Sequence, residues 1–126
     1  MNDTPVTRGR RVTKPWGYEL IWAETECYAG KILHIEKGQS LSLQYHERKD
    51  ETIHLLAGIL QLEFAGDGEV LRGVRLEPGD SFRVTPRLRH RMIAIETSDV
   101  VEVSSPELDD VVRLEDRYGR AGTKAP

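Results

Sequence analysis

The apolar residues of this chain occur in short runs that are closed by Gly, Pro or Asp, and this spacing limits the possible folds most strongly. No window sustains the 3.6-residue period of an amphipathic helix, so the runs predict β-strands. Turn sequences such as Gly66-Asp67-Gly68, Glu77-Pro78-Gly79-Asp80 and Thr97-Ser98-Asp99 separate most of them. The expected strands are Gly17–Ala23, Lys31–Glu36, Leu41–His46, Thr52–Ala57, Ile59–Phe64, Val70–Leu76, Ser81–Thr85, His90–Glu96 and Val100–Ser104. Roughly nine short strands predict an all-β sandwich or barrel.

The length and composition predict one folded domain with loose ends. A chain of 126 residues with 38% hydrophobic and 31% charged residues is typical of a globular protein with a polar surface. This composition excludes a collagen-like, a disordered and a membrane chain. We expect a flexible segment over residues 1–11, a domain over residues 12–120 and a frayed tail over residues 121–126.

The charge and the cysteine content restrict the partners and the compartment. A net charge of −3 disfavours nucleic acid as the main partner. No apolar stretch is long enough to span a membrane, and no secretory signal is present at the start. The single Cys27 excludes an internal disulfide and a thiolate metal cluster. We therefore expect a cytoplasmic protein with no nucleic-acid or membrane partner.

The strand expected at Leu41–His46 carries candidate metal ligands. Side chains two residues apart on a strand project from the same face, so Gln44 and His46 converge. A short turn brings Glu51 of the next strand beside them, and His90 arrives from a distant strand. Two imidazoles, a carboxylate and an amide oxygen can hold a divalent metal. Spacing alone does not separate this reading from ordinary structural histidines, which is the role we expect for His34 and His54.

These residues follow the pattern of a known family. The chain resembles the cupin superfamily, whose first motif is matched by Gly38, Gln44 and His46, Glu51, and Gly58. The second motif is matched by Gly79, by Thr85-Pro86-Arg87 at its Pro-x-Gly segment, and by His90. Gln44 replaces the usual first histidine, and the Pro-x-Gly segment is altered. The spacing of the ligands is kept.

Three further motifs narrow the resemblance. Lys14-Pro15-Trp16-Gly17, Leu41–His46 and the acidic ending Asp109–Arg120 are similar to type II mannose-6-phosphate isomerases. They resemble in particular the C-terminal cupin domain of the bifunctional mannose-6-phosphate isomerase/mannose-1-phosphate guanylyltransferases. The match covers about residues 12–120. Nothing in the chain resembles the nucleotide-binding loop of the guanylyltransferase half.

The resemblance implies a fold, a cofactor and a reaction. The implied fold is a cupin double-stranded β-helix, or jelly-roll barrel, in a single domain. It implies one divalent metal ion held by Gln44, His46, Glu51 and His90. Zinc is the first expectation, with manganese, iron, nickel and cobalt as alternatives. The implied reaction is aldose–ketose isomerisation of a sugar phosphate through an enediolate.

The resemblance also suggests catalytic and substrate-binding residues. Lys49 stands where the family carries an arginine, and Arg48 is displaced by one position. Lysine keeps the charge but lacks the bidentate fork that suits phosphate. Either residue can stabilise the enediolate or bind the phosphate. The expected substrate-binding residues are Arg87, Arg89, Arg113, Tyr118 and Arg120, although these arginines can equally form a solvated edge or pair with Asp109-Asp110 and Glu115-Asp116.

Two other functional classes stay open at this point. One is another metal-dependent cupin enzyme, such as an oxygenase or a natural-product- or sugar-modifying enzyme. The other is a non-catalytic cupin that binds a sugar or another metabolite. The fold alone does not choose among them.

The alternation of side chains also predicts a homodimer. If Gln44 and His46 face the barrel interior, then Leu41, Leu43 and Tyr45 face outward. The parity of Glu51 similarly leaves His54 and Leu56 on the outside. An outward apolar face needs a cover, and a second copy can supply it through a two-fold contact.

Overall fold

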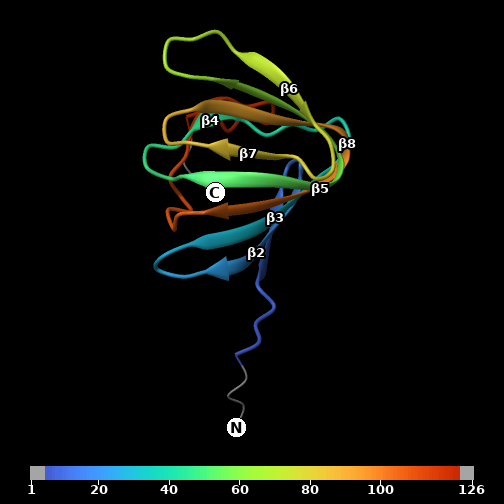
Figure 1. The fold of residues 1–126 in the computed structure, drawn as a ribbon, viewed down its shortest axis with the longest axis vertical. Helices are drawn as coiled ribbons and strands as arrows, with labels where there is room; N and C mark the ends of the chain where they lie inside the picture. Colours follow the sequence, from blue (N-terminus) through green and yellow to red (C-terminus); the bar gives the residue numbers. More distant parts are fainter. Residues whose placement is uncertain (1–4, 123–126) are drawn as a thin grey trace.

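A computed structural model describes residues 5–122, which form nine strands of one curled antiparallel sheet (Figure 1). The strands are β1 (Arg10–Lys14), β2 (Gly17–Glu24), β3 (Ala29–Ile35), β4 (Leu43–Tyr45), β5 (Glu51–Ala65), β6 (Arg72–Leu76), β7 (Ser81–Val84), β8 (Arg89–Ser104) and β9 (Val112–Glu115). The all-β class is therefore confirmed. Strand β1 begins at Arg10, inside the segment expected to be flexible, while residues 1–4 and 123–126 of the expected ends lie outside the described range.

The long strands β5 and β8 form the centre of the sheet. They pair antiparallel from Glu51 opposite Ser104 to Ala65 opposite Arg89. The path β1-β2-β3-β8-β4-β9 contains β8, while β5 also pairs with β6 and β7. Both long strands bend at the same side of the molecule (Figure 1), so each contributes to both layers of the sheet. This arrangement is the double-layered barrel that the sequence predicted.

Two breaks expected in these strands are absent from the structure. Gly58 was expected to separate two strands, and Thr97-Ser98-Asp99 was expected to form a turn. Instead, β5 and β8 continue through these positions with register shifts between Leu55 and Ile59. Gly58 has a φ of 97°, and a Cβ there would lie 2.4 Å from the carbonyl oxygen of Thr97. Glycine therefore permits a bulge, which bends the strand without ending it.

Two short strands were not expected at all. β1 and β9 are rich in charged residues and carry no apolar run, so their sequences resemble loops. Their strand conformation depends on partners, because β1 pairs with β2 and β9 pairs with β4. Edge strands of this kind are stabilised by their neighbours more than by their own propensity.

The expected outward face of residues 41–46 is wrong in part. Leu41 and Leu43 are only 9% and 4% exposed, and Leu41 belongs to the hydrophobic core with Trp16 and Ile53. The regular strand begins only at Leu43, so the assumed alternation does not extend back to Leu41. Tyr45 is half-buried. This apolar set therefore does not by itself require a partner subunit.

The rest of the core lies between the two layers and agrees with the predicted parity of β5. Ile53 and Leu55 are fully buried, whereas Leu56 is 52% exposed. The described residues contain no helix long and apolar enough to cross a membrane. The inner faces of the strands thus carry both the apolar core and the polar groups described next.

Candidate metal centre

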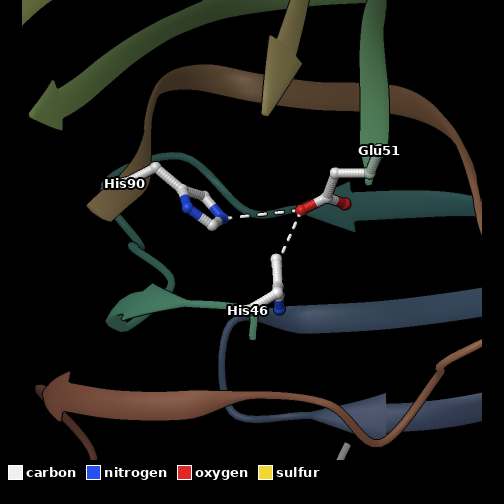
Figure 2. Close-up of side chains that lie close together, drawn as sticks. All are labelled: His46, Glu51 and His90. Carbon is white, nitrogen blue, oxygen red and sulfur yellow. Dashed lines mark hydrogen bonds and ion pairs between the residues drawn. The ribbon is translucent and has the colours of Figure 1, made fainter. Parts of the chain in front are cut away.

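Two side chains from one short segment, His46 and Glu51, and a third from a distant strand, His90, meet inside the barrel (Figure 2). His46 follows β4, Glu51 begins β5 and His90 lies at the start of β8. The Nε2 atom of His46 is 2.8 Å from Glu51 Oε1, and the Nε2 atom of His90 is 3.5 Å from the same oxygen. All three side chains are at most 3% exposed. Their ligand atoms lie within 4.8 Å of one another, so the group can hold a metal ion.

The backbone fixes the orientation of both imidazole rings. Nδ1–H of His46 donates to the carbonyl oxygen of Asp110 at 2.6 Å, and Nδ1–H of His90 donates to that of Leu88 at 3.0 Å. A carbonyl oxygen can only accept, so the proton of each neutral ring sits on Nδ1. The lone pair of each Nε2 atom then faces Glu51. Metal-binding histidines are commonly oriented in this way by a second hydrogen bond.

The buried polar atoms of this group fit a cation. His90 Nε2 and Glu51 Oε2 have no hydrogen-bond partner although both are buried. Burial opposes ionisation of Glu51, but the positive charge of Lys49 is the largest influence that holds the pKa of this carboxyl well below its usual range. An ionised carboxylate between two neutral imidazoles is a donor set for a divalent metal such as zinc. The residues present therefore fit the metal that the sequence predicted.

Gln44, the fourth predicted ligand, lies next to this triad. It stands opposite His90 in the pairing of β4 with β8, and residues directly opposite one another share a face of the sheet. Its Oε1 atom accepts a hydrogen bond from Ser42 Oγ at 2.5 Å. The amide oxygen has a second lone pair. Coordination by Gln44 stays a prediction.

The two predicted catalytic residues point to different places. Lys49 is 4% exposed, and its Nζ atom lies 3.1 Å from Glu102 Oε2 and 3.6 Å from Glu51 Oε2. Burial alone would lower the pKa of Lys49, but Glu102 and Glu51 raise it, so the ammonium ion persists. Burial and the charge of Glu51 raise the pKa of Glu102 to about 7. Arg48, in contrast, is exposed at the surface.

A second group of buried charges was missed from the sequence. Lys31 Nζ lies 3.2 Å from Glu19 Oε1, and Lys14 Nζ lies 3.8 Å from Glu19 Oε2. All three residues are less than 9% exposed. The sequence did contain one indication of this site. Lys31, Leu33 and Ile35 are spaced two residues apart and therefore lie on the same, inward face of β3. A charged residue on an apolar strand face indicates a buried polar site.

Pairing of the terminal acidic residues with arginines, which the sequence left open, occurs at Glu115 with Arg91 and at Asp116 with Arg120, whereas Asp110 has other partners. Its carboxylate accepts backbone N–H bonds from Glu47, Arg48 and Lys49, at 3.0, 2.7 and 2.9 Å. Burial opposes ionisation, but these three hydrogen bonds lower the pKa of the Asp110 carboxyl. Asp110 therefore holds the loop between His46 and Glu51 in place. No sequence motif identified this role.

The five predicted substrate-binding residues fall into two groups. The side chains of the first group, Arg87 and Arg89, lie away from the triad. Arg89 neighbours His90 on β8, so its side chain faces the opposite side of the sheet. Its guanidinium donates to the carbonyl oxygens of Gly66 and Glu69, and that of Arg87 donates to Glu47 at 2.7 Å. Both arginines border a hollow of about 230 Å³, together with Tyr45, Asp67 and Leu114. No residue of the triad borders this hollow.

The second group comes from the last described segment. Arg113 is 5% exposed and stands opposite Gln44 in the pairing of β4 with β9. Tyr118 donates from its hydroxyl to Gln39 Oε1 and packs against the core. Arg120 forms two hydrogen bonds with Asp116, at 3.1 and 3.0 Å. Of the five predicted substrate-binding residues, Arg113 is therefore the one whose strand pairing places it beside Gln44, next to the metal centre.

Comparison with known proteins places the chain among barrels of this type. Residues 31–105 match the family model described as "Cupin domain". The chain is 32% identical over 117 residues to the mannose-1-phosphate guanylyltransferase ManC of Salmonella typhimurium, covering 88% of this chain and 23% of that protein. It is 31% identical over 113 residues to the xanthan biosynthesis protein XanB of Xanthomonas campestris, covering 88% of this chain and 24% of that one. The chain spans about a quarter of the length of these curated relatives.

Solved structures agree with the fold. KdgF from Halomonas sp. superposes with a TM-score of 0.66 at 27% identity, covering 75% of this chain and 84% of that one. A mutant of the Bacillus subtilis oxalate decarboxylase OxdC superposes with a TM-score of 0.73 at 16% identity, covering 84% of this chain and 30% of that one. The second likeness concerns the fold alone. The resemblance to cupins is thus confirmed, as is the resemblance to the C-terminal region of mannose-1-phosphate guanylyltransferases.

Proposed function

The chain belongs to the cupin family, and from this premise we propose that it is a metal-dependent aldose–ketose isomerase acting on a sugar phosphate, of the mannose-6-phosphate isomerase type. The observation that carries the proposal is the buried triad of His46, Glu51 and His90, whose Nε2 and carboxylate atoms face one point. The similarity to enzymes named for mannose 1-phosphate chemistry supports a sugar phosphate as substrate.

The reaction moves one proton between neighbouring carbon atoms. A base removes the proton from the carbon beside the carbonyl group, which gives an enediolate, and the proton returns to the other carbon. His46, Glu51 and His90, with Gln44 as the proposed fourth ligand, would hold the metal. A bound divalent ion supplies Lewis-acid polarisation of the sugar oxygens. Zinc is the proposed ion, with manganese, iron, nickel or cobalt as alternatives.

The chain supplies positive charge beside the reacting atoms. Lys49 is fixed between Glu51 and Glu102, so its ammonium group is ordered before a substrate arrives. An ordered cation in a water-poor site stabilises developing negative charge on an enediolate oxygen. We assign this role to Lys49 rather than to Arg48, whose side chain is exposed.

Burial of the site excludes bulk water from the reaction. Both histidines are at most 2% exposed, and the neighbouring Ser42 is 1% exposed. Low solvent access strengthens each charge interaction in the site.

We also propose a homodimer and a cytoplasmic location. Leu41 and Leu43 are buried in the core and cannot form the interface. We place it instead on the outer face of β2, β3 and β8. There, Trp22 and Val103 are 42% and 49% exposed, and the side chain of Trp22 lies against Gly30. Exposed apolar side chains on one sheet face favour association with a second copy. Light scattering at micromolar concentration tests this, and a 14.3 kDa particle would contradict it.

The function is tested with metal-loaded protein and a panel of aldose phosphates. Proton nuclear magnetic resonance should detect the ketose phosphate, and exchange of solvent deuterium into the substrate should accompany it. His90→Ala should abolish both signals, while the outward His54→Ala should keep them. Binding without turnover would instead support a non-catalytic cupin, and consumption of oxygen would support an oxygenase.

A further inference from the structure

We propose that the hollow bordered by Tyr45, Asp67, Arg87, Arg89 and Leu114 is a binding site for one neutral sugar ring. The hollow lies on the outer side of the sheet, and no residue of the metal centre borders it. The proposal therefore goes beyond the proposed isomerase site and does not rest on it. It gives a role to two arginines whose side chains lie away from the triad.

Arg87 holds a strained backbone conformation that its contribution to stability does not explain. Its φ is 70°, and it is the one non-glycine residue with a positive φ in the range 5–122. The backbone N–H of Arg87 donates to the carbonyl oxygen of His46 at 2.7 Å, a bond that glycine would also make. Its side chain forms an exposed ion pair with Glu47, which contributes little to stability. Strained residues concentrate at functional sites, so this side chain is a candidate contact for a ligand.

Arg89 has an unused donor beside the same hollow. Its Nη2 atom donates to the carbonyl oxygens of Gly66 and Glu69, and these bonds fix the guanidinium against the turn that follows β5. Its Nε–H is buried and has no hydrogen-bond partner. Buried donors are rarely left unpaired in native proteins, so this group points to a ligand that accepts a hydrogen bond.

Tyr45 and Leu114 supply an apolar wall of matching size. Tyr45 is half-buried, and Leu114 is 42% exposed. The guanidinium carbon of Arg87 lies 5.8 Å from the centre of the Tyr45 ring, so the cation and the aromatic ring are neighbours. The volume of about 230 Å³ is below the range of about 300–1,000 Å³ that holds drug-sized ligands. A single ring that offers C–H groups to the aromatic face fits this space.

The polar groups at the hollow select a neutral ligand with several hydroxyl groups. Arg87 and Arg89 can only donate hydrogen bonds, and the carboxylate of Asp67 can only accept them. Positive charge is not in surplus, because Glu47 pairs with Arg87 and the carboxylate of Glu69 caps the turn that contains Asp67. An anion or a cation would therefore meet a group of its own sign. Each hydroxyl of a sugar both donates and accepts, so neighbouring hydroxyls satisfy both kinds of group.

The test is a nuclear magnetic resonance titration of the isotope-labelled full chain with neutral methyl glycosides of mannose, glucose and galactose, in the presence of a chelator. These glycosides carry no phosphate and cannot open to an aldehyde, so they are not substrates of the proposed isomerase. At least one should shift the amide resonances of Arg87, Arg89 and Leu114 in a saturable way. The amide resonances of Glu51 and Glu102, on the side of the metal centre, should move little.

Arg87→Gly separates binding from stability. Glycine relieves the strained backbone, so the fold should be kept while the affinity falls by about 10-fold or more with the loss of a charged donor. Tyr45→Leu should weaken binding as well, whereas Tyr45→Phe keeps the ring face and should retain it. The matched control is Arg83→Met, because Arg83 is also an exposed arginine in an ion pair, with Asp50, but does not border the hollow. It should change the affinity by less than about 2-fold.

Several outcomes would overturn the site. These are no saturable shift with any neutral glycoside, full affinity in both Arg87→Gly and Tyr45→Leu, and tighter binding of methyl glucuronide than of methyl glucoside, which would reject a neutral ligand. Shifts confined to the metal centre would refute the site as well. Circular dichroism identifies a variant that fails to fold, and the other variant then decides. The result is independent of isomerisation, because the titration uses the metal-free protein.

Discussion

His46 and Asp110 are 64 residues apart in the chain, yet the imidazole Nδ1–H of His46 donates to the carbonyl oxygen of Asp110 at 2.6 Å. The carboxylate of the same Asp110 accepts three N–H bonds from residues 47–49. One residue therefore orients a candidate metal ligand and also holds the loop that leads to Glu51. It acts through these neighbours and is a positioning residue.

Replacement of Asp110 tests this positioning role. Asp110→Ala keeps the carbonyl group that accepts from His46 but removes the carboxylate that holds residues 47–49. The loop between His46 and Glu51 then loses its anchor, and the affinity for zinc should fall by about 10- to 100-fold, as it does when the outer contacts of metal ligands are removed. The matched control is Asp109→Ala, because Asp109 is exposed and precedes it directly. Competition with a fluorescent zinc chelator measures both. Equal affinities in the two variants would show that the loop is held by other contacts.

Removal of a triad histidine should remove the metal. His90→Ala should lower the metal content of the purified protein from about one ion per chain to near zero, because it removes one of the two imidazole ligands and leaves only His46 and Glu51 of the triad. The midpoint of thermal unfolding should fall as well, since a bound ion stabilises the folded state by mass action. Mass spectrometry of the metal and calorimetry measure the two effects. His54→Ala is the control, and an unchanged metal content in His90→Ala would reject the site.

Lys49 should be essential for stability as well as for chemistry. Lys49→Met leaves Glu51 and Glu102 facing one another in the interior and should lower the free energy of unfolding by about 3–5 kcal/mol. The double variant Lys49→Met/Glu102→Gln should recover most of this loss, because the repulsion is removed. Arg48→Met should change stability by less than about 0.5 kcal/mol. Urea unfolding measures all three, and a double variant no more stable than Lys49→Met would reject the repulsion.

Arg87 occupies the glycine position of the second cupin motif in a conformation that suits glycine. Its φ is 70°, in the left-handed region, where a side chain costs about 1–2 kcal/mol. Arg87→Gly should therefore keep or raise the free energy of unfolding, even though the exposed pair with Glu47 is lost. Arg87→Val should lower it, since a β-branched residue is strained there. Thermal unfolding that ranks valine above glycine would contradict this conformation.

His34 should give the protein a pH-dependent increment of stability. A hydrogen bond of 2.7 Å with Asp99 raises the pKa of His34, and Glu36 at 3.2 Å raises it further, against the effect of burial. Because the folded pKa exceeds the unfolded value near 6.5, the stabilisation is complete below that value and is lost as the pH rises through the folded pKa. His34→Gln should thus be less stable than wild type near pH 5.5, by less than about 1 kcal/mol for this partly exposed pair.

Unfolding in urea at pH 5.5 and pH 8.5 measures the difference between His34→Gln and wild type. The control is His54→Gln, whose ring contacts the hydroxyl of Ser81 at 2.7 Å rather than a carboxylate. A His34→Gln deficit that grows toward pH 8.5 would contradict the assignment.

The fold class was predicted from the local alternation of side chains and from turn residues. The meeting of His46, Glu51 and His90 was predicted from the spacing of the family motifs. Strand alternation and turn residues are local, and a family motif records the spacing of the ligands. The charged network of Glu19, Lys31 and Glu102 was not predicted, since each residue reads as an ordinary surface charge until its partners are placed. The positioning role of Asp110 was not predicted either. Its partners are backbone N–H groups, which every residue carries and no sequence pattern marks.

The closure of the sheet also determines when this site can exist during folding. Arg113 of β9 pairs with Gln44 of β4, and Lys49 reaches Glu102 across 53 residues of chain. Contacts between segments so far apart form slowly, because the intervening loop must lose its conformational freedom first. An incompletely folded chain therefore has His46 and Glu51 close in sequence but lacks His90, Asp110 and Arg113 around them. We therefore expect metal uptake to follow the pairing of β4 with β8, which brings His90 beside the other two candidate ligands.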